Sequence, residues 1–171
     1  MLHQYTHIKT NEHLININLN DKTSSRTVYL VDDDRDDRLF GFNQLRKSDR
    51  IRDIKTLDCA DALFEKLDNT GFYKCMSYAE ENKPVILLDI HMPNVNGIEL
   101  LEKIRSHPIT SNFTVILLTS DLSCENIYDA YRLDANGYLE KPFCVNEFHK
   151  ILEKIDSGSD TIEFSKSVKL N

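Results

Sequence analysis

Residues 85–97 read VILLDIHMPNVNG, and this stretch decides the fold. Its first four residues form an uninterrupted apolar run, which is typical of a strand covered on both faces within a parallel sheet. Asp89 ends that run. The turn-forming residues that follow are Pro93, Asn94, Asn96 and Gly97. The stretch therefore predicts a buried strand that carries an acidic side chain to the start of a loop.

Strand and helix patterns alternate on both sides of this stretch. Four further segments are predicted as strands: Thr27–Val31, Ile51–Leu57, Phe113–Leu118 and Gly137–Glu140. Helical spacing of apolar residues predicts five helices between and after the strands. Their marker residues are Leu39, Phe42 and Leu45, expected on one face of a helix from about Arg35; Ala60, Leu63, Phe64 and Leu67; Ile98, Leu101 and Ile104; Ile127, Ala130 and Tyr131; and Val145, Phe148, Leu152 and Ile155.

This fivefold βα alternation predicts an α/β fold, a doubly wound parallel sheet with helices on both faces. We expect one domain over residues 27–156, an N-terminal extension at 1–26 and a C-terminal tail at 157–171 outside the fold. Residues 69–83 stay ambiguous between a loop and a helical extension. No second domain follows residue 155 in this sequence, so we expect no built-in DNA-binding or enzymatic output.

Composition excludes several classes of function. The net charge of −7 argues against nucleic-acid binding through bulk charge. No apolar run reaches the roughly 18 residues of a membrane span, and the N-terminus lacks the apolar core of a signal peptide, so a cytoplasmic protein is expected. The four cysteines lack metal-site spacing. A homodimer through the weakly apolar segment 161–170 is left open.

Polar side chains follow four of the predicted strands, and parallel strands end at the same edge of a sheet. The residues are Asp32, Asp33 and Asp34; Asp89; Thr119, Ser120 and Asp121; and Lys141. Ligands of such sheets bind beyond this edge. Two carboxylates about 4 Å apart repel by roughly 4 kcal/mol at an effective dielectric near 20. They therefore take up protons or bind a cation, and oxygen-only ligands suit Mg²⁺ or Mn²⁺.

The same cluster suits phosphoryl transfer, which needs positioning and charge neutralisation more than acid–base chemistry. A carboxylate can be the nucleophile that receives the group. Lys141 offers a separate positive charge for a phosphoryl oxygen, and the hydroxyl of Thr119 can donate to another.

Over residues 27–155 the sequence resembles the receiver domains of two-component response regulators. Four motifs carry the resemblance in combination: Val31-Asp32-Asp33; Leu88 to Gly97; Leu118-Thr119-Ser120; and Gly137-Tyr138-Leu139-Glu140-Lys141-Pro142-Phe143. The resemblance implies a flavodoxin-like sheet of five strands in the order 2-1-3-4-5. It also implies a single-domain regulator whose phosphoryl group comes from a sensor histidine kinase or a histidine phosphotransfer protein. The group then switches a protein-binding surface for a downstream target or passes on in a phosphorelay.

Residue roles follow from the same resemblance. Asp89 is similar to the phosphoacceptor of the family. The protein ligands of the family's metal ion correspond here to the side chains of Asp32, Asp33 and Asp89 and to the backbone carbonyl of His91. Thr119 resembles the switch hydroxyl, Lys141 the lysine that contacts the phosphoryl group, and Tyr138 the switch aromatic residue. A cis Lys141–Pro142 bond is also implied. His91 and Asp121 stand at positions that tune phosphoryl lifetime in the family, and we expect them to set a particular hydrolysis rate.

Simpler interpretations compete with these roles. Asp34, Asp36 and Asp37 are better explained as a solvated helix start than as site residues, because acids favour helix N-termini. A calcium loop is excluded, since its sixth position is Asp37 rather than glycine. A metal-dependent aspartyl-phosphate phosphatase would need an acid at position 91, where the chain has His. A receiver-like scaffold that takes no phosphate is opposed by the five site residues present.

Overall fold

The structure is a computed structural model of the 171-residue chain. It describes residues 6–10, 13–17, 26–69, 84–93, 95–108, 110–120, 124–158 and 163–165; of these, the side chains of 6–10, 13–17, 66–69, 124–127 and 163–165 are not described. Of the ambiguous segment 69–83, residues 70–83 lie outside this range, and Asn69 is the last residue of a helix.

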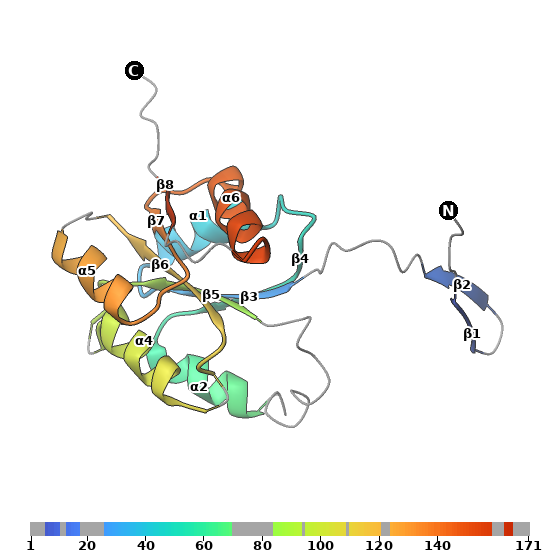
Figure 1. The fold of residues 1–171 in the computed structure, drawn as a ribbon, viewed down its shortest axis with the longest axis horizontal. Helices are drawn as coiled ribbons and strands as arrows, with labels where there is room; N and C mark the ends of the chain where they lie inside the picture. The colour runs from blue at the N-terminus through green and yellow to red at the C-terminus, as the bar shows by residue number, and fades with distance from the viewer. Residues whose placement is uncertain are drawn as a thin grey trace, which may run out of the picture.

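Five parallel strands form the body of the main sheet (Figure 1). In chain order they are β3 (Arg26–Val31), β4 (Ile51–Leu57), β5 (Val85–Asp89), β6 (Thr114–Thr119) and β7 (Gly137–Glu140). They lie side by side as β4-β3-β5-β6-β7, which confirms the predicted order 2-1-3-4-5. Strand β5, whose five residues are all buried, lies at the centre of this group, as its apolar run predicts.

Among the described residues, five helices connect the strands, and they cover both faces of the sheet (Figure 1). They are α1 (Arg35–Leu45), α2 (Ala60–Asn69), α4 (Gly97–Ser106), α5 (Cys124–Arg132) and α6 (Val145–Asp156). Helices α1 and α6 lie on one face, and α2, α4 and α5 on the other. This is the doubly wound arrangement expected from the alternation of elements.

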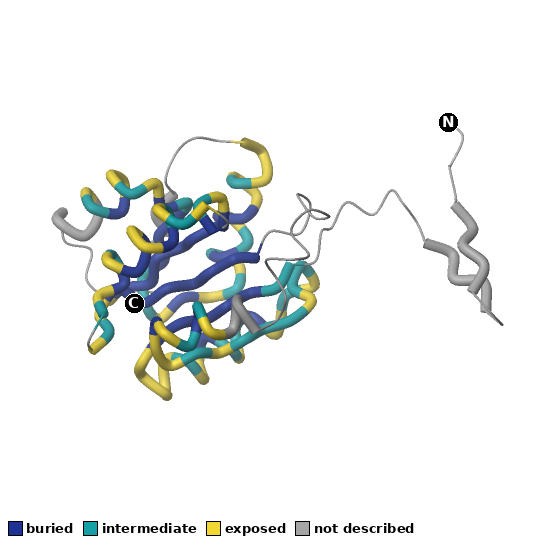
Figure 2. Tube along the Cα trace, turned by 90° about the horizontal axis from the view of Figure 1, so that it is seen from below, coloured by how far each residue is buried: buried dark blue, intermediate teal, exposed yellow. Residues whose placement is uncertain are grey.

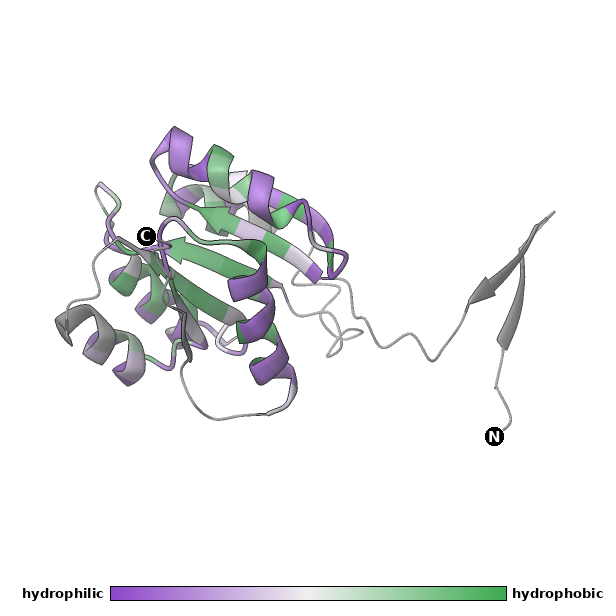
Figure 3. Ribbon diagram, turned by 90° about the horizontal axis from the view of Figure 1, so that it is seen from above, coloured by the Kyte–Doolittle hydropathy of each residue, from purple (hydrophilic) through white to green (hydrophobic). Residues whose placement is uncertain are grey.

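The apolar core forms two layers because successive strand residues point to opposite faces. Val28 and Leu30 pack with Phe148 on the α1 and α6 side, whereas Tyr29 and Val31 pack with Leu100 on the other side. The strands β3, β5, β6 and β7 are the most deeply buried part of the described chain in Figure 2, and Figure 3 shows them as the most hydrophobic part. The outward faces of the helices are mostly hydrophilic.

A sixth strand, β8 (Glu163–Ser165), pairs in parallel with β7 and extends the sheet by one strand. The expectation that the chain lies outside the fold from residue 157 onward is therefore wrong at these three residues. Within the N-terminal extension, β1 (Thr6–Thr10) and β2 (His13–Ile17) form a separate antiparallel hairpin.

One helix face differs from the prediction. Leu39 is 56% exposed although Leu45 is fully buried, so the two residues do not share a face. Six helical residues correspond to a rotation of about 600°, which leaves the two side chains about 120° apart. The predicted helix is present, but the assignment of Leu39 to the face of Leu45 is wrong.

Candidate functional site

Parallel pairing brings the ends of four strands to one edge of the sheet. Val31 pairs with Leu88, Asp89 with Leu118, and Thr119 with Glu140. Asp32 directly follows β3, Asp89 ends β5, and Lys141 directly follows β7. The predicted convergence of these side chains is therefore present in the structure.

Three carboxylates meet at this edge. Oxygen atoms of Asp32, Asp33 and Asp89 all lie within 4.8 Å of one another. Asp32 is 1% exposed and Asp89 is 4% exposed, whereas Asp33 is open to solvent. Two of the three charges are thus held away from water, where their mutual repulsion is only weakly screened.

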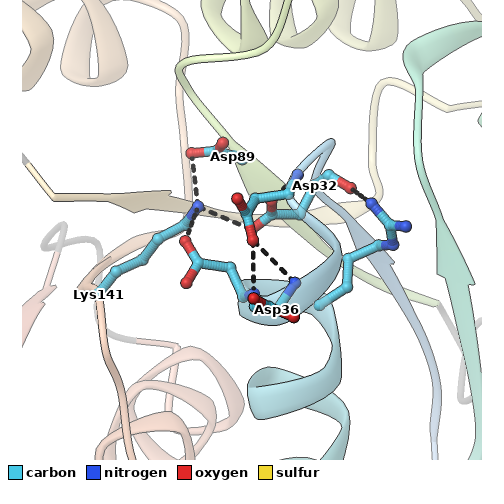
Figure 4. Close-up of polar contacts among 7 residues, drawn as sticks. Asp32, Asp36, Asp89 and Lys141 are labelled. Carbon is cyan, nitrogen blue, oxygen red and sulfur yellow. Dashed lines mark hydrogen bonds and ion pairs between the residues drawn. The ribbon is translucent and has the colours of Figure 1, made fainter.

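Lys141 is the cation that the fold places against these acids (Figure 4). Its Nζ lies 2.7 Å from Oδ2 of Asp32, 3.2 Å from Oδ1 of Asp89 and 3.1 Å from Oδ2 of Asp37. An ammonium has three N–H donors, so each donor has one carboxylate to face. The lysine thereby links three separate chain segments at the edge of the sheet.

Burial and charge shift two of these groups. Burial of Asp32 raises the pKa of its carboxyl group, although the hydrogen bond from Lys141 works in the opposite direction. Burial by itself lowers the pKa of Lys141, but the hydrogen bond and charge of Asp32, the charge of Asp89 and the hydrogen bond to Asp37 outweigh it and raise that pKa. Lys141 therefore stays a cation throughout the physiological pH range.

The turn from Asp89 to α4 depends on one glycine. The N–H of Ile90 donates to the carbonyl of Leu118, and the N–H of Gly97 donates to the carbonyl of Ile90. A Cβ at residue 97 would lie 2.2 Å from the carbonyl oxygen of Asp89 and 2.8 Å from Cα of Ile90. Both obstacles are backbone atoms, so only glycine fits here. Asn96 caps α4 by accepting a hydrogen bond from the N–H of Ile98.

The start of α1 fixes the other side of the site. The carboxylate of Asp34 accepts hydrogen bonds from the N–H groups of Asp36 and Asp37, which makes Asp34 the N-cap. This confirms its interpretation as a helix start. The guanidinium of Arg38 donates to the backbone carbonyl of Asp32 at 2.6 Å, and Oδ1 of Asp32 accepts from the N–H of Asp34. Residues at the start of α1 therefore fix both the side chain and the backbone of the buried Asp32.

The carboxylates fit a divalent cation. Asp32, Asp33, Asp37 and Asp89 bring four formal negative charges, and Lys141 with Arg38 brings two positive ones. The remaining excess of negative charge beside two buried carboxylates favours a bound cation. Carboxylate oxygens with an open side toward solvent, at Asp33, match the preferences of Mg²⁺, which keeps several of its waters. Asp32, Asp33 and Asp89 are the side chains that would hold the ion.

The remaining predicted residues divide into buried and exposed ones. Thr119 is fully buried at the end of β6, and Tyr138 is 1% exposed within β7. His91 is exposed in the loop after β5, and Asp121 lies outside the described residues. The Lys141–Pro142 peptide bond is cis, as the resemblance implies.

Asp37 contributes to the site although the sequence does not predict it as a site residue. Its carboxylate forms an ion pair with Lys141, although the pattern of acids in the first helical turn indicates only a solvated helix start. Asp37 and Phe40 also border a small cavity beside the site, together with Asp32, Lys141 and Phe143. The position of Asp37 in the sequence could have indicated this contact, because Asp37 lies in the first turn of the helix that follows the strand end carrying Asp32.

Comparisons with known proteins agree with this geometry. Residues 28–153 match the family model described as the response regulator receiver domain. The chain belongs to this family. Its members are switch domains rather than classical enzymes, and membership implies a histidine kinase as the phosphodonor.

Solved structures show the same fold. The bacteriophytochrome response regulator RtBRR is 26% identical with a TM-score of 0.62, over 85% of this chain and 82% of that chain. A two component response regulator from Cytophaga hutchinsonii is 26% identical with a TM-score of 0.65, over 78% of this chain and 98% of that chain. The receiver domain of the histidine kinase CKI1 from Arabidopsis thaliana, complexed with Mg²⁺, is 19% identical with a TM-score of 0.64, over 79% and 96%; that likeness shows the fold alone.

Curated relatives match over about half of the chain. Sensory transduction protein LytT of Oceanobacillus iheyensis is 38% identical over 89 residues, which are 52% of this chain and 35% of that protein. Regulatory protein AtoC of Escherichia coli is 34% identical over 86 residues, 50% of this chain and 18% of that protein. The matched region is thus about a third or less of each relative. In the part of the chain that the structure describes, none of the helices has the length and apolar character needed to cross a membrane.

Proposed function

We propose that this protein is a single-domain response regulator that accepts a phosphoryl group on Asp89 from a phosphohistidine donor. The observation that carries the proposal is the meeting of three carboxylates within 4.8 Å at the carboxyl edge of the sheet, with Lys141 3.2 Å from Asp89. Mg²⁺ or Mn²⁺, held by Asp32, Asp33, Asp89 and the backbone carbonyl of His91, would supply positive charge against the transferred group.

The transfer uses Asp89 as a nucleophile. A carboxylate oxygen attacks phosphorus, an O–P bond forms, and the N–P bond to the donor imidazole breaks. The electron pair of that bond stays on the imidazole nitrogen, and a proton taken from water lets the ring leave as neutral imidazole. Lys141 offsets charge on one phosphoryl oxygen, and the hydroxyl of Thr119 donates to another. Thr119 ends β6, the neighbour of the acceptor strand β5, and Lys141 directly follows β7.

The phosphoryl group then biases a protein-binding surface formed by α5, β7 and α6. Thr119 ends β6 and Tyr138 lies in the neighbouring β7, where Leu117 and Tyr138 are paired. A hydroxyl drawn toward the phosphoryl group would alter the packing next to Tyr138, which is buried in the present structure. Such a change shifts the balance between two surface states. The output is contact with a downstream protein or onward transfer in a phosphorelay.

The cellular setting belongs to the same proposal. We place the protein in the cytoplasm, where a sensor kinase or phosphotransfer protein would reach Asp89. The proposed domain covers residues 27–156, and β8 adds an edge strand to its sheet. Nucleic acid is not among the proposed partners because the net charge is −7. A homodimer remains a proposal. The segment 161–170, through which a homodimer was considered, includes Glu163–Ser165. These three residues pair with β7 of the same chain.

Intact-mass analysis after incubation with acetyl phosphate and Mg²⁺ tests the proposal. The parent chain should gain the mass of one phosphoryl group, and Asp89→Asn should gain none. The same parent chain should take phosphate from a phosphorylated histidine phosphotransfer protein. A parent chain that stays unmodified with both donors would contradict the proposal and favour a scaffold that takes no phosphate.

A further inference from the structure

Lys141 has a third acidic partner that the proposed function does not use. Oδ2 of Asp37 lies 3.1 Å from Nζ of Lys141. Asp37 belongs to the first turn of α1, whereas the other two partners belong to the strand ends. The acidic start of this helix thus reaches the cation that faces the acceptor residue.

The three partners of Lys141 differ in burial. The side chain of Asp37 is 51% exposed, against 1% for Asp32 and 6% for Asp89. Exposed ion pairs are weak because water screens them and because ordering the side chains costs entropy. The two buried carboxylates therefore make the stronger contacts with the ammonium, and Asp37 makes the weakest of the three.

A phosphoryl group on Asp89 would need a donor from the same ammonium. All three donors face carboxylates in the present structure, so one contact must weaken when the phosphoryl oxygens arrive. Asp37 is the partner with the least burial, and it belongs to the first turn of α1 rather than to a strand end. Its negative charge also lies close to the place that a doubly charged group would occupy.

We propose that Asp37 is a positioning residue that acts through Lys141 and competes with the phosphoryl group for its ammonium. This inference rests on the proposed function of Asp89 and Lys141. Asp37 holds the lysine in the unphosphorylated chain and weakens binding of the phosphorylated form. Removing the charge of Asp37 should therefore strengthen binding of a phosphoryl mimic at Asp89.

Asp36 offers a matched control. It carries the same charge in the same exposed helical turn, yet within the described part of the chain it forms no ion pair with Lys141. Asp36→Asn and Asp37→Asn alter the charge of the helix start equally. Only Asp37→Asn removes the contact with the lysine. The difference between the two variants therefore reports the contact rather than the general field.

Calorimetric titration with beryllofluoride in saturating Mg²⁺ measures the effect on the full chain. Asp37→Asn should bind beryllofluoride about threefold more tightly than Asp36→Asn, the size expected for an exposed ion pair. Asp37→Glu, which keeps the charge, should return the affinity to that of the parent. Circular dichroism melts of all three variants check that they fold.

Two results with the asparagine variants, and one with Asp37→Glu, would overturn the inference while leaving the proposed function intact. One is equal affinity in Asp37→Asn and Asp36→Asn, and the other is weaker binding in Asp37→Asn. An Asp37→Glu variant that behaves like Asp37→Asn would also overturn it, because charge would then not be the cause. If the parent chain does not bind beryllofluoride at all, the proposed function fails, and this inference fails with it.

Discussion

The ammonium of Lys141 lies 2.7 Å from the carboxylate of Asp32, although their strands β7 and β3 are separated in the sheet by β5 and β6. This ion pair therefore spans the edge on which Asp89 lies. The lysine and a bound dication would neutralise the same carboxylates, so the two cations compete. The following four tests concern that charge balance, the backbone that shapes the site, and the stability of the fold.

Replacing Lys141 should strengthen the binding of Mg²⁺. In Lys141→Met the carboxylates lose their protein cation, so we expect magnesium affinity to rise about tenfold, which corresponds to relief of roughly 1.4 kcal/mol of repulsion. Titration calorimetry with MgCl₂ measures this directly. Lys103→Met, which removes an exposed lysine in the last turn of α4, is the control. Unchanged or weaker binding in Lys141→Met would contradict the charge balance described for the site.

Removing one exposed acid should have the opposite effect on metal binding. Asp33 is part of the carboxylate cluster but is open to solvent, so Asp33→Asn should fold normally. Ligand binding to the native state raises stability by mass action. We expect the rise in melting temperature caused by Mg²⁺ to be largely lost in Asp33→Asn and kept in Glu102→Gln, an exposed change on α4. An undiminished magnesium effect in Asp33→Asn would exclude this residue as a ligand.

Gly97→Ala should damage both stability and the site. The added methyl group would overlap backbone atoms of Asp89 and Ile90. Backbone atoms cannot move aside as the end of a flexible side chain can. We expect a loss of about 2–4 kcal/mol in the free energy of unfolding, measured with urea, together with weaker magnesium binding. At Gly41 the nearest atom to an added Cβ is a side-chain carbon of Leu30 at 3.0 Å, so Gly41→Ala should cost less. Equal losses would argue against a backbone constraint at residue 97.

His149 should make the fold less stable in mild acid. Burial, and next the charge of Arg50, lower the pKa of His149 below its usual 6.5, although Asp49 and Glu153 act in the opposite direction. Its ring nitrogen Nε2 lies 2.6 Å from the hydroxyl of Ser48. As the pH falls below about 6.5, the unfolded chain takes up this proton before the folded chain does, so stability decreases progressively until the folded pKa is passed.

Urea unfolding at about pH 7.5 and about pH 5.5 measures this contribution, because the two values lie on either side of the ordinary histidine pKa. The decrease in unfolding free energy between them should be smaller in His149→Gln than in the parent. A His149→Gln profile identical to that of the parent would show that this histidine does not contribute.

The sequence predicts those parts of the fold that depend on local pattern. The apolar run before Asp89 predicts the central strand, and the polar residues after each strand predict the site, because parallel strands end at one edge. The interpretation of Leu39 failed because its spacing of six from Leu45 does not match the helical repeat. The three residues of β8 are too few to show a periodicity, so their pairing with β7 could not be predicted.

Contacts between distant segments could not be predicted for a different reason. The ion pair of Asp37 with Lys141 depends on how α1 packs beside the end of β7, and no local pattern encodes that distance. The same holds for Arg105, whose guanidinium donates to the carbonyl groups of Ser111, Phe113 and Asp134. An isolated acid or arginine on a helix is usually solvated, and the sequence alone favours that interpretation.

The most direct test of the account is the position of the phosphoryl group. An acyl phosphate on aspartate is reduced by borohydride to homoserine, which marks the modified residue in a peptide map. After treatment with acetyl phosphate and Mg²⁺, we predict homoserine at residue 89 in the parent chain and none in a sample prepared with EDTA. Homoserine at residue 32 or 33, or none at all in a chain that binds Mg²⁺, would contradict the assignment of Asp89 as the acceptor.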